Sequence, residues 1–246
     1  MFAFRDTRGR VDVAFTDRHG GVSDGPFTSL NLAVTGDDDP LAVAENVRRM
    51  VEAFTGDRSA PVVGMHQVHG SDVVVVSDAE VGEAASGRLP VGDALVTVQP
   101  GVALMVRAAD CVPVLLADQA AGVVAAVHSG RPGVAAGVVT RAVETMRDLG
   151  ADHIDAWVGP HVCGACYEVP EAMREEVAAQ VPETYATTTW GTPALDIGAG
   201  VRAQLAAAGV AVTVVDRCTR EDEDLFSYRR QGRASGRLAG LAWVRP

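Results

Sequence analysis

Residues 102–130 read VALMVRAADCVPVLLADQAAGVVAAVHSG. Three short runs rich in β-branched and other apolar residues lie in this stretch, at 102–106, 112–116 and 122–127, with turn-forming residues between them. Apolar runs of this length, bounded by turn residues, are typical of buried β-strands. Because the three runs are nearly continuous, they predict neighbouring strands at the centre of a sheet that forms the core.

Helices are predicted after this stretch. Residues 134–149 carry apolar side chains at helical spacing with charged side chains between them, and Gly150 follows as a cap. Two further helices are expected at 170–180, where Pro170 suits the first turn, and at 200–208, which Gly209 ends.

Additional strands are predicted at 73–76, 154–158 and 211–215, while the acidic stretch 36–40 and the small-residue stretch 80–89 are interpreted as surface loops. The order of elements mixes hairpin-like neighbours with helical crossovers. It therefore predicts an α/β (α+β) fold with a mixed β-sheet and packed helices.

Length and composition indicate one cytoplasmic domain. The 246 residues, 48% of them hydrophobic, supply enough apolar surface for one large core, so we expect a single domain over 1–246. No window approaches the roughly 18 uninterrupted apolar residues of a membrane span, and the N-terminal MFAFRDTRGR carries charge where a signal peptide is apolar. The sequence leaves the oligomeric state open.

The charge pattern excludes several functions. A formal net charge of -11 opposes binding to a nucleic-acid backbone, which depends on Lys and Arg. The 21 basic residues are all Arg, which excludes a Schiff-base lysine and a Walker-type phosphate loop. A phosphate or carboxylate ligand would therefore be held by Arg, whose planar fork suits bidentate contacts.

Metal-binding residue types lie next to the ends of predicted strands in three segments. They occur in HQVHG at 66–70, in ADC at 109–111 and in AVHSG at 126–130. Strand ends converge in space, and one thiolate with two imidazoles suits zinc, leaving one coordination position for water or substrate. The spacing alone also allows a buried, inert cysteine and histidines that bond to backbone carbonyls.

Seven motifs occur in the order and at the approximate separations found in the laccase-domain family, which the chain therefore resembles. They include GMHQVHG at 64–70, ADCVPVLLAD at 109–118, AAVHSG at 125–130, GPHVCGACYEV at 159–169 and a long C-terminal motif at 218–243. Family members carry the names purine nucleoside phosphorylase, multicopper polyphenol oxidoreductase and peptidoglycan editing factor.

The resemblance implies a sandwich related to cysteine-hydrolase toxins, with a metal held by His69, Cys111 and His128. The metal is expected to be zinc, which copper could replace because copper binds such sites more tightly. One motif departs from the family pattern: Gly-Trp-Arg-Gly is replaced here by Gly-Arg-Pro-Gly at 130–133, which affects the expected substrate preference.

The resemblance also implies a purine nucleoside phosphorylase, acting on adenosine, inosine or methylthioadenosine, with adenosine deaminase activity. Deamination would use metal-activated water at C6 together with a carboxyl proton shuttle, for which Asp93 and Glu168 are candidates. Phosphorolysis needs a phosphate cradle, and three residues are predicted to form it with the substrate: Ser23, Asn31 and Arg230.

Two other functions remain open. With Cys111 as nucleophile and His128 as base, the protein would be a hydrolase or amidase that edits peptidoglycan precursors. A copper polyphenol oxidase could use the same ligands, but oxygen reduction requires further coppers. The CxxC at Cys163 and Cys166 is interpreted as a turn rather than as a redox motif.

Overall fold

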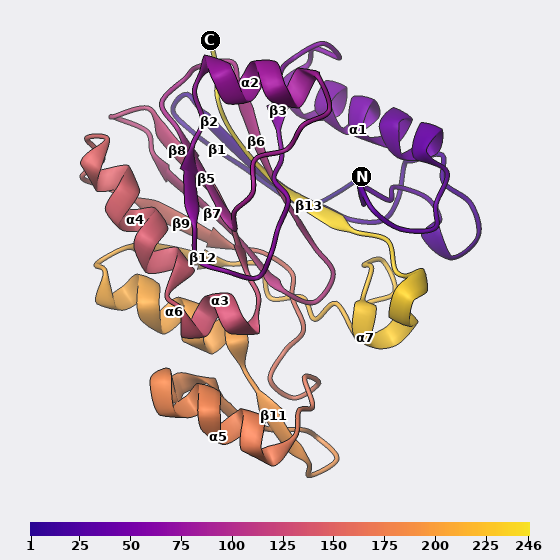
Figure 1. The fold of residues 1–246 in the computed structure, drawn as a ribbon, viewed down its shortest axis with the longest axis vertical. Coiled ribbons are helices and arrows are strands. Elements are labelled where there is room, and N and C mark those ends of the chain that lie inside the picture. The colour runs from indigo at the N-terminus through magenta and orange to yellow at the C-terminus, as the bar shows by residue number, and fades with distance from the viewer.

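The computed structural model describes residues 1–246 and contains two large sheets (Figure 1). Five strands form one sheet, in the order β1-β2-β13-β6-β3, and six strands form the other, in the order β12-β9-β7-β8-β5-β4. The five-stranded sheet contains β1 (Phe2–Arg8), β2 (Val11–Thr16), β13 (Leu238–Val244), β6 (Ala103–Ala108) and β3 (Val62–Val63). The six-stranded sheet contains β12 (Ala211–Val214), β9 (Asp155–Val158), β7 (Val112–Asp118), β8 (Val123–Ser129), β5 (Ala94–Thr97) and β4 (Val73–Val75).

Both sheets are mixed. In the six-stranded sheet, β7 pairs antiparallel with β8 and β9, whereas β4 with β5 and β12 with β9 are parallel. The remaining elements are α1 (Pro40–Thr55), α2 (Asp78–Ala85), α3 (Arg131–Ala135), α4 (Val138–Asp148), α5 (Glu171–Gln180), α6 (Ile197–Ala207), α7 (Tyr228–Gln231), the pair β10 (Tyr185–Thr187) and β11 (Pro193–Leu195), and three short 3-10 turns. This arrangement confirms the predicted mixed α/β class.

Three apolar clusters show that the elements form four layers. The innermost cluster lies between the sheets, and the second lies between the six-stranded sheet and the helices α4 and α6. The third packs α1 against the outer face of the five-stranded sheet. The order of layers is therefore helix, sheet, sheet and helices, which is a sandwich (Figure 1).

Strands β7 and β8 are buried along their whole length because both of their faces are covered. On β8, Val123, Ala125 and Val127 contact the helical layer, whereas Val124 and Ala126 face the other sheet. Successive side chains of a strand point to opposite faces. His128 therefore lies on the face of β8 that meets the five-stranded sheet.

The stretch 102–130 divides between the two sheets. We expected its three strands to lie together in one sheet, which is wrong for the first of them: β6 pairs with β13 and β3, while β7 and β8 pair in the other sheet. The chain crosses between the sheets at Ala109, Asp110 and Cys111, and Asp110 has a φ of 91°. The crossing therefore lies at the residues predicted to carry the metal ligand.

Two helix predictions are corrected. The helix predicted at 134–149 is divided into α3 and α4 because Gly137, with a φ of 71°, breaks the helical conformation between them. The stretch 80–89, expected as a loop, contains most of α2. This helix begins with a capping box formed by Ser77 and Glu80. No helix combines the length and apolar character that crossing a bilayer requires.

Candidate metal centre

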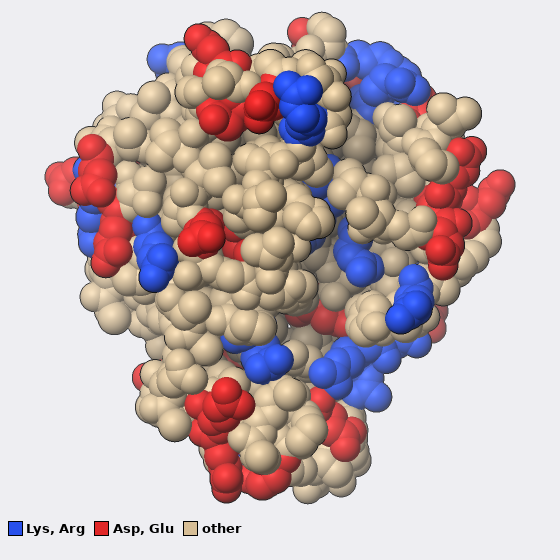
Figure 2. Space-filling view, in the orientation of Figure 1, with Lys and Arg blue, Asp and Glu red and all other residues tan.

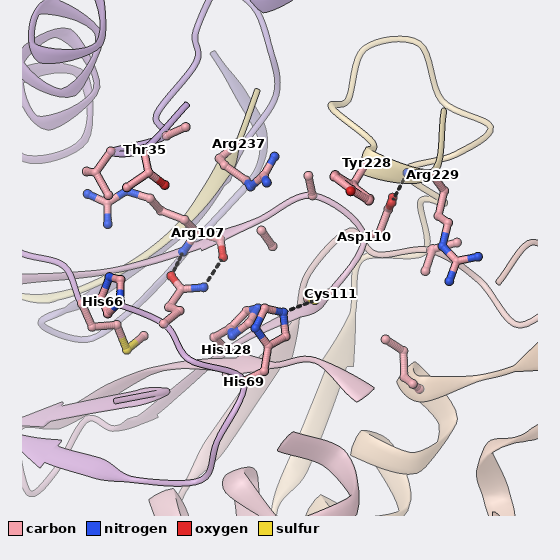
Figure 3. Close-up of a pocket in the computed structure, with 18 of the residues that line it drawn as sticks. Thr35, His66, His69, Arg107, Asp110, Cys111, His128, Tyr228, Arg229 and Arg237 are labelled. Carbon is pink, nitrogen blue, oxygen red and sulfur yellow. Dashed lines mark hydrogen bonds between the residues drawn. The ribbon is translucent and has the colours of Figure 1, made fainter. Parts of the chain in front are cut away.

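The structure brings His69, Cys111 and His128 together, and we call these three residues the His–Cys–His centre. Cys111 Sγ lies 3.7 Å from His69 Nε2, and the two imidazole rings meet edge to face with their centroids 4.8 Å apart. One ligand atom from each residue lies within 4.8 Å of the others. His69 belongs to the loop between β3 and β4, Cys111 to the crossing between the sheets, and His128 to β8 (Figure 3).

The backbone around the centre contains conformations that are rare in general and frequent at functional sites. His69 and Asp110, with φ values of 61° and 91°, are the chain's two non-glycine residues with positive φ. Such conformations persist where the surroundings enforce them, and they concentrate at functional sites. At Gly130 a Cβ atom would lie 2.7 Å from His69 Cδ2 and 3.1 Å from Cys111 Sγ, so glycine is required there.

The loop that carries His69 is held to β6 by a side-chain amide. Gln67 donates to the carbonyl oxygen of Arg107 at 2.7 Å and accepts from its N–H at 2.9 Å, which imitates a strand pair (Figure 3). The QVHG motif is therefore docked on the five-stranded sheet, while His128 comes from the six-stranded sheet. The centre connects the two sheets.

Asp93 organises both histidines. Its carboxylate lies 2.8 Å from His128 Nδ1, accepts from the N–H groups of His69 and Gly70 at 3.0 and 2.6 Å, and is fully buried. Because Nδ1 of His128 is bonded to the carboxylate, Nε2 is the nitrogen available to a metal ion. Metal-binding histidines usually have their other ring nitrogen bonded to a carboxylate or carbonyl group in this way. These contacts favour a positioning role for Asp93, and its predicted role as proton shuttle stays a prediction.

The electrostatics of the centre favour a thiolate. Burial alone would raise the pKa of Cys111, but hydrogen bonding and charge from His128 and His69 outweigh burial and lower that pKa to about 6. Burial likewise opposes the charged form of His128, but Asp93 and Cys111 raise its pKa to about 9. The pKa of Asp93 lies below its ordinary value, because bonds from His128, Gly70 and His69 exceed the effect of burial.

The donor set fits a borderline or soft metal ion. Sulfur and imidazole nitrogen are ligands that zinc and copper prefer, and three protein ligands leave a position open to the pocket. The three donors already lie close together, and Asp93 orients one imidazole. The residues present therefore fit the implied metal, and which metal the protein uses stays a prediction.

A pocket of about 500 Å³ opens beside the centre. Figure 2 shows basic side chains in and beside the hollow near the middle of this face, whereas most acidic side chains lie toward its outline. The residues lining the pocket that the sequence did not suggest include two arginines, Arg107 and Arg237, and two tyrosines, Tyr167 and Tyr228. The absence of lysine pointed to Arg as a class, but the sequence did not single out Arg107, nor Arg237 among the several arginines of the motif at 218–243.

The residues predicted to bind substrate lie elsewhere or are already engaged. Ser23 donates to Asp38 and accepts from Asn46, and the side chain of Asn31 is bonded to Asp38, Ala33 and Arg237. Neither residue lines this pocket, although Asn31 lines an adjoining hollow, and both bond to Asp38 in the loop that precedes α1. Their predicted contact with substrate stays a prediction.

Arg230 lies outside the pocket lining. Its guanidinium donates to the carbonyl oxygens of Thr219, Arg220, Asp222 and Leu225, which fixes the segment before α7. Glu168, which is exposed, accepts from the indole N–H of Trp190. These contacts give both residues structural roles, and the predicted roles of Arg230 in phosphate binding and of Glu168 as proton shuttle stay untested.

A family model described as multi-copper polyphenol oxidoreductase laccase matches residues 12–245. A purine nucleoside phosphorylase of Streptomyces coelicolor is 54% identical, over 99% of this chain and 100% of that protein. A purine nucleoside phosphorylase of Deinococcus radiodurans is 41% identical, over 93% of this chain and 87% of that protein.

Solved structures are similar in fold. YlmD from Geobacillus stearothermophilus has a TM-score of 0.88 at 31% identity, covering 100% of this chain and 99% of that one. The hypothetical protein YfiH of Bacillus licheniformis has a TM-score of 0.87 at 27% identity, covering 96% of this chain and 93% of that one. The similarity extends over both sheets and the helices that cover them.

Proposed function

Because this chain belongs to the multi-copper polyphenol oxidoreductase laccase family and resembles relatives named purine nucleoside phosphorylase, we propose that it cleaves purine nucleosides with phosphate. The reaction takes place in the pocket beside the His–Cys–His centre and uses a divalent metal, zinc or copper. Adenosine, inosine and methylthioadenosine are the proposed nucleosides. Deamination of adenosine is proposed as a second activity of the same pocket.

The observation that carries this proposal is a guanidinium nitrogen without a hydrogen-bond partner on an arginine that lines the pocket. Arg107 is 7% exposed, its Nε donates to the carbonyl oxygen of Leu32 at 2.8 Å, and its Nη1 has no partner in the protein. Burial lowers the pKa of Arg107 to about 10, which leaves it charged at neutral pH. A buried, charged donor without a partner is costly, so a bound anion is its natural complement.

Arg237 is the second candidate for the anion. It lines the same pocket, and only Nη1 of its guanidinium bonds to protein, at the carbonyl oxygens of Ser235 and Gly236. Two arginines with free donors supply the bidentate, charge-assisted contacts that phosphate requires. Tyr167 and Tyr228 line the wall and offer aromatic surface to a purine.

The proposed phosphorolysis balances as a displacement at C1′ of the ribose. A phosphate oxygen forms the new bond to C1′, the bond from C1′ to N9 breaks, and its electron pair leaves on the purine, which takes up a proton. Arg107 and Arg237 orient the phosphate, and the pocket excludes water from C1′. In deamination, water adds at C6 and ammonia leaves. A bound metal would supply Lewis-acid polarisation.

The test compares two reactions of one enzyme. Removing a charge-assisted contact costs about 1.5 to 3 kcal/mol, so Arg237→Ala and Arg107→Ala should each lower phosphate-dependent base release by roughly ten- to a hundredfold. Adenosine deamination, which uses water, should fall much less. The measured quantity is the ratio of the two rates at saturating nucleoside.

Arg48→Ala is the matched control, because it removes the same charge from the exposed face of α1. The ratio should not change in this variant. If the ratio is also unchanged in Arg237→Ala and Arg107→Ala, phosphate binds elsewhere or phosphorolysis is not the reaction.

A second function is supported by the line Asp93–His128–Cys111, which is also the order of acid, base and nucleophile in a cysteine hydrolase. The lowered pKa of Cys111 suits a nucleophile. Exhaustive chelation discriminates between the two functions. Turnover that survives metal removal but is lost on alkylation of Cys111 would favour the hydrolase or amidase, with peptidoglycan precursors as the substrate to assay.

A copper polyphenol oxidase receives less support from the remaining histidines. His66 lies at the pocket, but His19 pairs with Asp224, His153 is 90% exposed beside Asp152, and His161 is bonded to the carbonyl oxygen of Gly159. These four histidines do not gather into a further cluster. The coupled copper sites that oxygen reduction needs would therefore lack ligands.

A further inference from the structure

A second group of metal-binding residue types lies apart from the His–Cys–His centre. Its members, which we call the cysteine cluster, are Cys163, Cys166, Cys218 and Glu221. One ligand atom from each lies within 4.8 Å of the others. We propose that the cysteine cluster is a closed metal site that binds one zinc ion through three thiolates and one carboxylate.

The cluster is built from two turns of the same design. Cys163 and Cys166 are separated by two residues, and the N–H of Cys166 donates to the carbonyl oxygen of Cys163 at 3.0 Å. Cys218 and Glu221 repeat this spacing, and the N–H of Glu221 donates to the carbonyl oxygen of Cys218 at 3.2 Å. Paired turns with two residues between ligands are the usual frame of a structural zinc site.

The two turns are held face to face by contacts that do not depend on an ion. His161 pairs with Cys218 in an isolated parallel bridge, in which the N–H of Thr219 donates to the carbonyl oxygen of His161 at 3.0 Å. The N–H of Cys163 points at Cys218 Sγ, 3.4 Å away. A backbone donor aimed at a ligand sulfur stabilises its charged form.

The separations suit zinc. Four ligands around a tetrahedral zinc with bonds near 2.3 Å lie about 3.8 Å from one another, so the observed limit of 4.8 Å requires only a small contraction. All four cysteines of the chain are free thiols. A disulfide would use two of the three sulfurs and leave the third and the carboxylate without a role.

Burial and charge agree with a structural ion. Cys166 is 4% exposed, the other two cysteines are half-buried, and Glu221 is exposed, which gives an ion access from solvent. Zinc with three thiolates and a carboxylate carries a net charge of about two negative units. Arg220 offsets part of this charge, since its Nη1 donates to the carbonyl oxygen of Cys166 at 3.0 Å.

The consequence is a cross-link next to the substrate pocket. Tyr167, which follows Cys166, lines the pocket, and the guanidinium of Arg229 lies over its ring at 4.5 Å. Thr219 Oγ1 and the N–H of Arg229 both donate to the carboxylate of Asp110 at 2.6 Å. An ion in the cysteine cluster would therefore hold the wall that packs against the residue preceding Cys111.

The test counts zinc and copper together in protein expressed and purified without added metal, and it does not require activity. About two equivalents per chain are expected in the wild type and about one in Cys111→Ser and in Cys218→Ser. In Cys111→Ser every remaining cysteine belongs to the cluster. X-ray absorption of its zinc should show three sulfur neighbours at about 2.3 Å and one oxygen at about 2.0 to 2.2 Å.

Three results would overturn the proposal. They are Cys111→Ser protein without metal, zinc in that protein with only nitrogen and oxygen neighbours, and a mass two units low under non-reducing conditions, which indicates a disulfide. Each is read only from protein that is folded by circular dichroism.

Glu221→Gln tests the fourth ligand without disturbing buried sulfur. Removing a residue that only hydrogen-bonds to a metal ligand typically lowers metal affinity about 10- to 100-fold. Loss of a direct ligand should therefore weaken zinc binding by at least about tenfold, as measured by competition with a chelator. Glu223→Gln is the matched control, because Glu223 is an exposed carboxylate outside the cluster. Equal affinities in the two variants would contradict the four-ligand site.

Discussion

The His–Cys–His centre and the cysteine cluster use similar ligands in opposite electrostatic settings. In the centre, a single thiol lies between two imidazoles, one of which is bonded to the buried carboxylate of Asp93. In the cluster, three thiols and a carboxylate lie together with no imidazole among them. The centre combines a cation and anions, whereas the cluster contains only acids.

The thiol pKa values follow from this difference. Burial opposes ionisation of Cys111, but His128 and His69 lower its pKa to about 6. Burial, together with the neighbouring Cys163 and Cys218, raises the pKa of Cys166 well above its ordinary range. The lowered pKa of Cys111 thus favours its thiolate before a metal binds, whereas the raised pKa values of Cys163 and Cys166 favour the neutral thiols.

The number of ligands separates the two sites further. The three candidate ligands of the centre border the pocket and would leave a position for substrate, whereas the four of the cluster lie outside the pocket lining and would leave none. The comparison teaches that the same residue types can form a reactive site or a structural one, depending on which neighbours compensate the charge. Substitutions in either site test this contrast.

The largest effect is expected from Cys111→Ser. A protonated hydroxyl replaces a soft thiolate, so this variant should lose the metal of the centre and at least about a hundredfold in nucleoside turnover. The fold should persist, because Cys111 lies at a crossing rather than in either core. Metal content, turnover and the thermal midpoint are the measurements.

Cys163→Ser is the control for this change, since it makes the same cysteine-to-serine replacement in the cysteine cluster. It should keep the metal of the centre. Full turnover and undiminished metal in Cys111→Ser would count against both the phosphorylase and the hydrolase.

A smaller effect is expected from Asp93→Asn, which keeps the shape of the side chain but removes its charge. The amide can no longer accept both from His128 and from the N–H groups of His69 and Gly70, so metal affinity should fall about 10- to 100-fold. Competition with a chelator measures this change.

Asp118→Asn is the matched control because Asp118 is also buried and accepts four backbone N–H bonds, from residues 120, 121, 152 and 153, at the opposite end of β7. Both variants should be destabilised, but only Asp93→Asn should lose metal affinity. An equal affinity in the two variants would show that Asp93 acts only on the fold.

The convergence of His69, Cys111 and His128, the candidate metal ligands, could be predicted from the sequence because each lies in a short family-like motif next to a strand. Gln67 and Gly130, which hold two of these motifs in place, belong to the same motifs. The role of Asp93 was less accessible, since only the pairing of β5 with β8 places its carboxylate against His128. Predicting it would have required the register of strands that are 35 residues apart.

The division of 102–130 between two sheets could not be predicted from apolar runs. Strands buried in either sheet have the same composition, and the crossing depends on a backbone conformation at Asp110 that composition does not encode. Arg107 and Arg237, two arginines of the pocket lining, were not predicted for a similar reason. Arg107 is the only charged residue in an otherwise apolar strand, a signal that pointed to burial but not to a ligand.

The smallest effect concerns the reactivity of Cys111 in metal-free protein. A thiol with a pKa of about 6 is roughly 90% ionised at pH 7, compared with about 3% for an ordinary cysteine with a pKa near 8.5. Nucleophilicity falls as the pKa falls, which cancels most of this roughly thirtyfold advantage and leaves about a two- to threefold faster alkylation. The rate at one pH is therefore a weak test.

The pH profile is decisive where the rate is not. Because the pKa of Cys111 is lowered, its thiolate persists on the acid side, and alkylation should fall only as the pH drops through about 6. The pKa values of Cys163 and Cys166 are raised, so their alkylation should increase only at a pH above the ordinary pKa range of cysteine.

Mass spectrometry of each cysteine after timed iodoacetamide treatment between pH 4.5 and 9.5 measures all three profiles in one sample. His128→Gln should move the Cys111 midpoint upward, because His128 is the largest of the influences that lower it. A single shared midpoint for the three cysteines would remove the electrostatic contrast between the two sites.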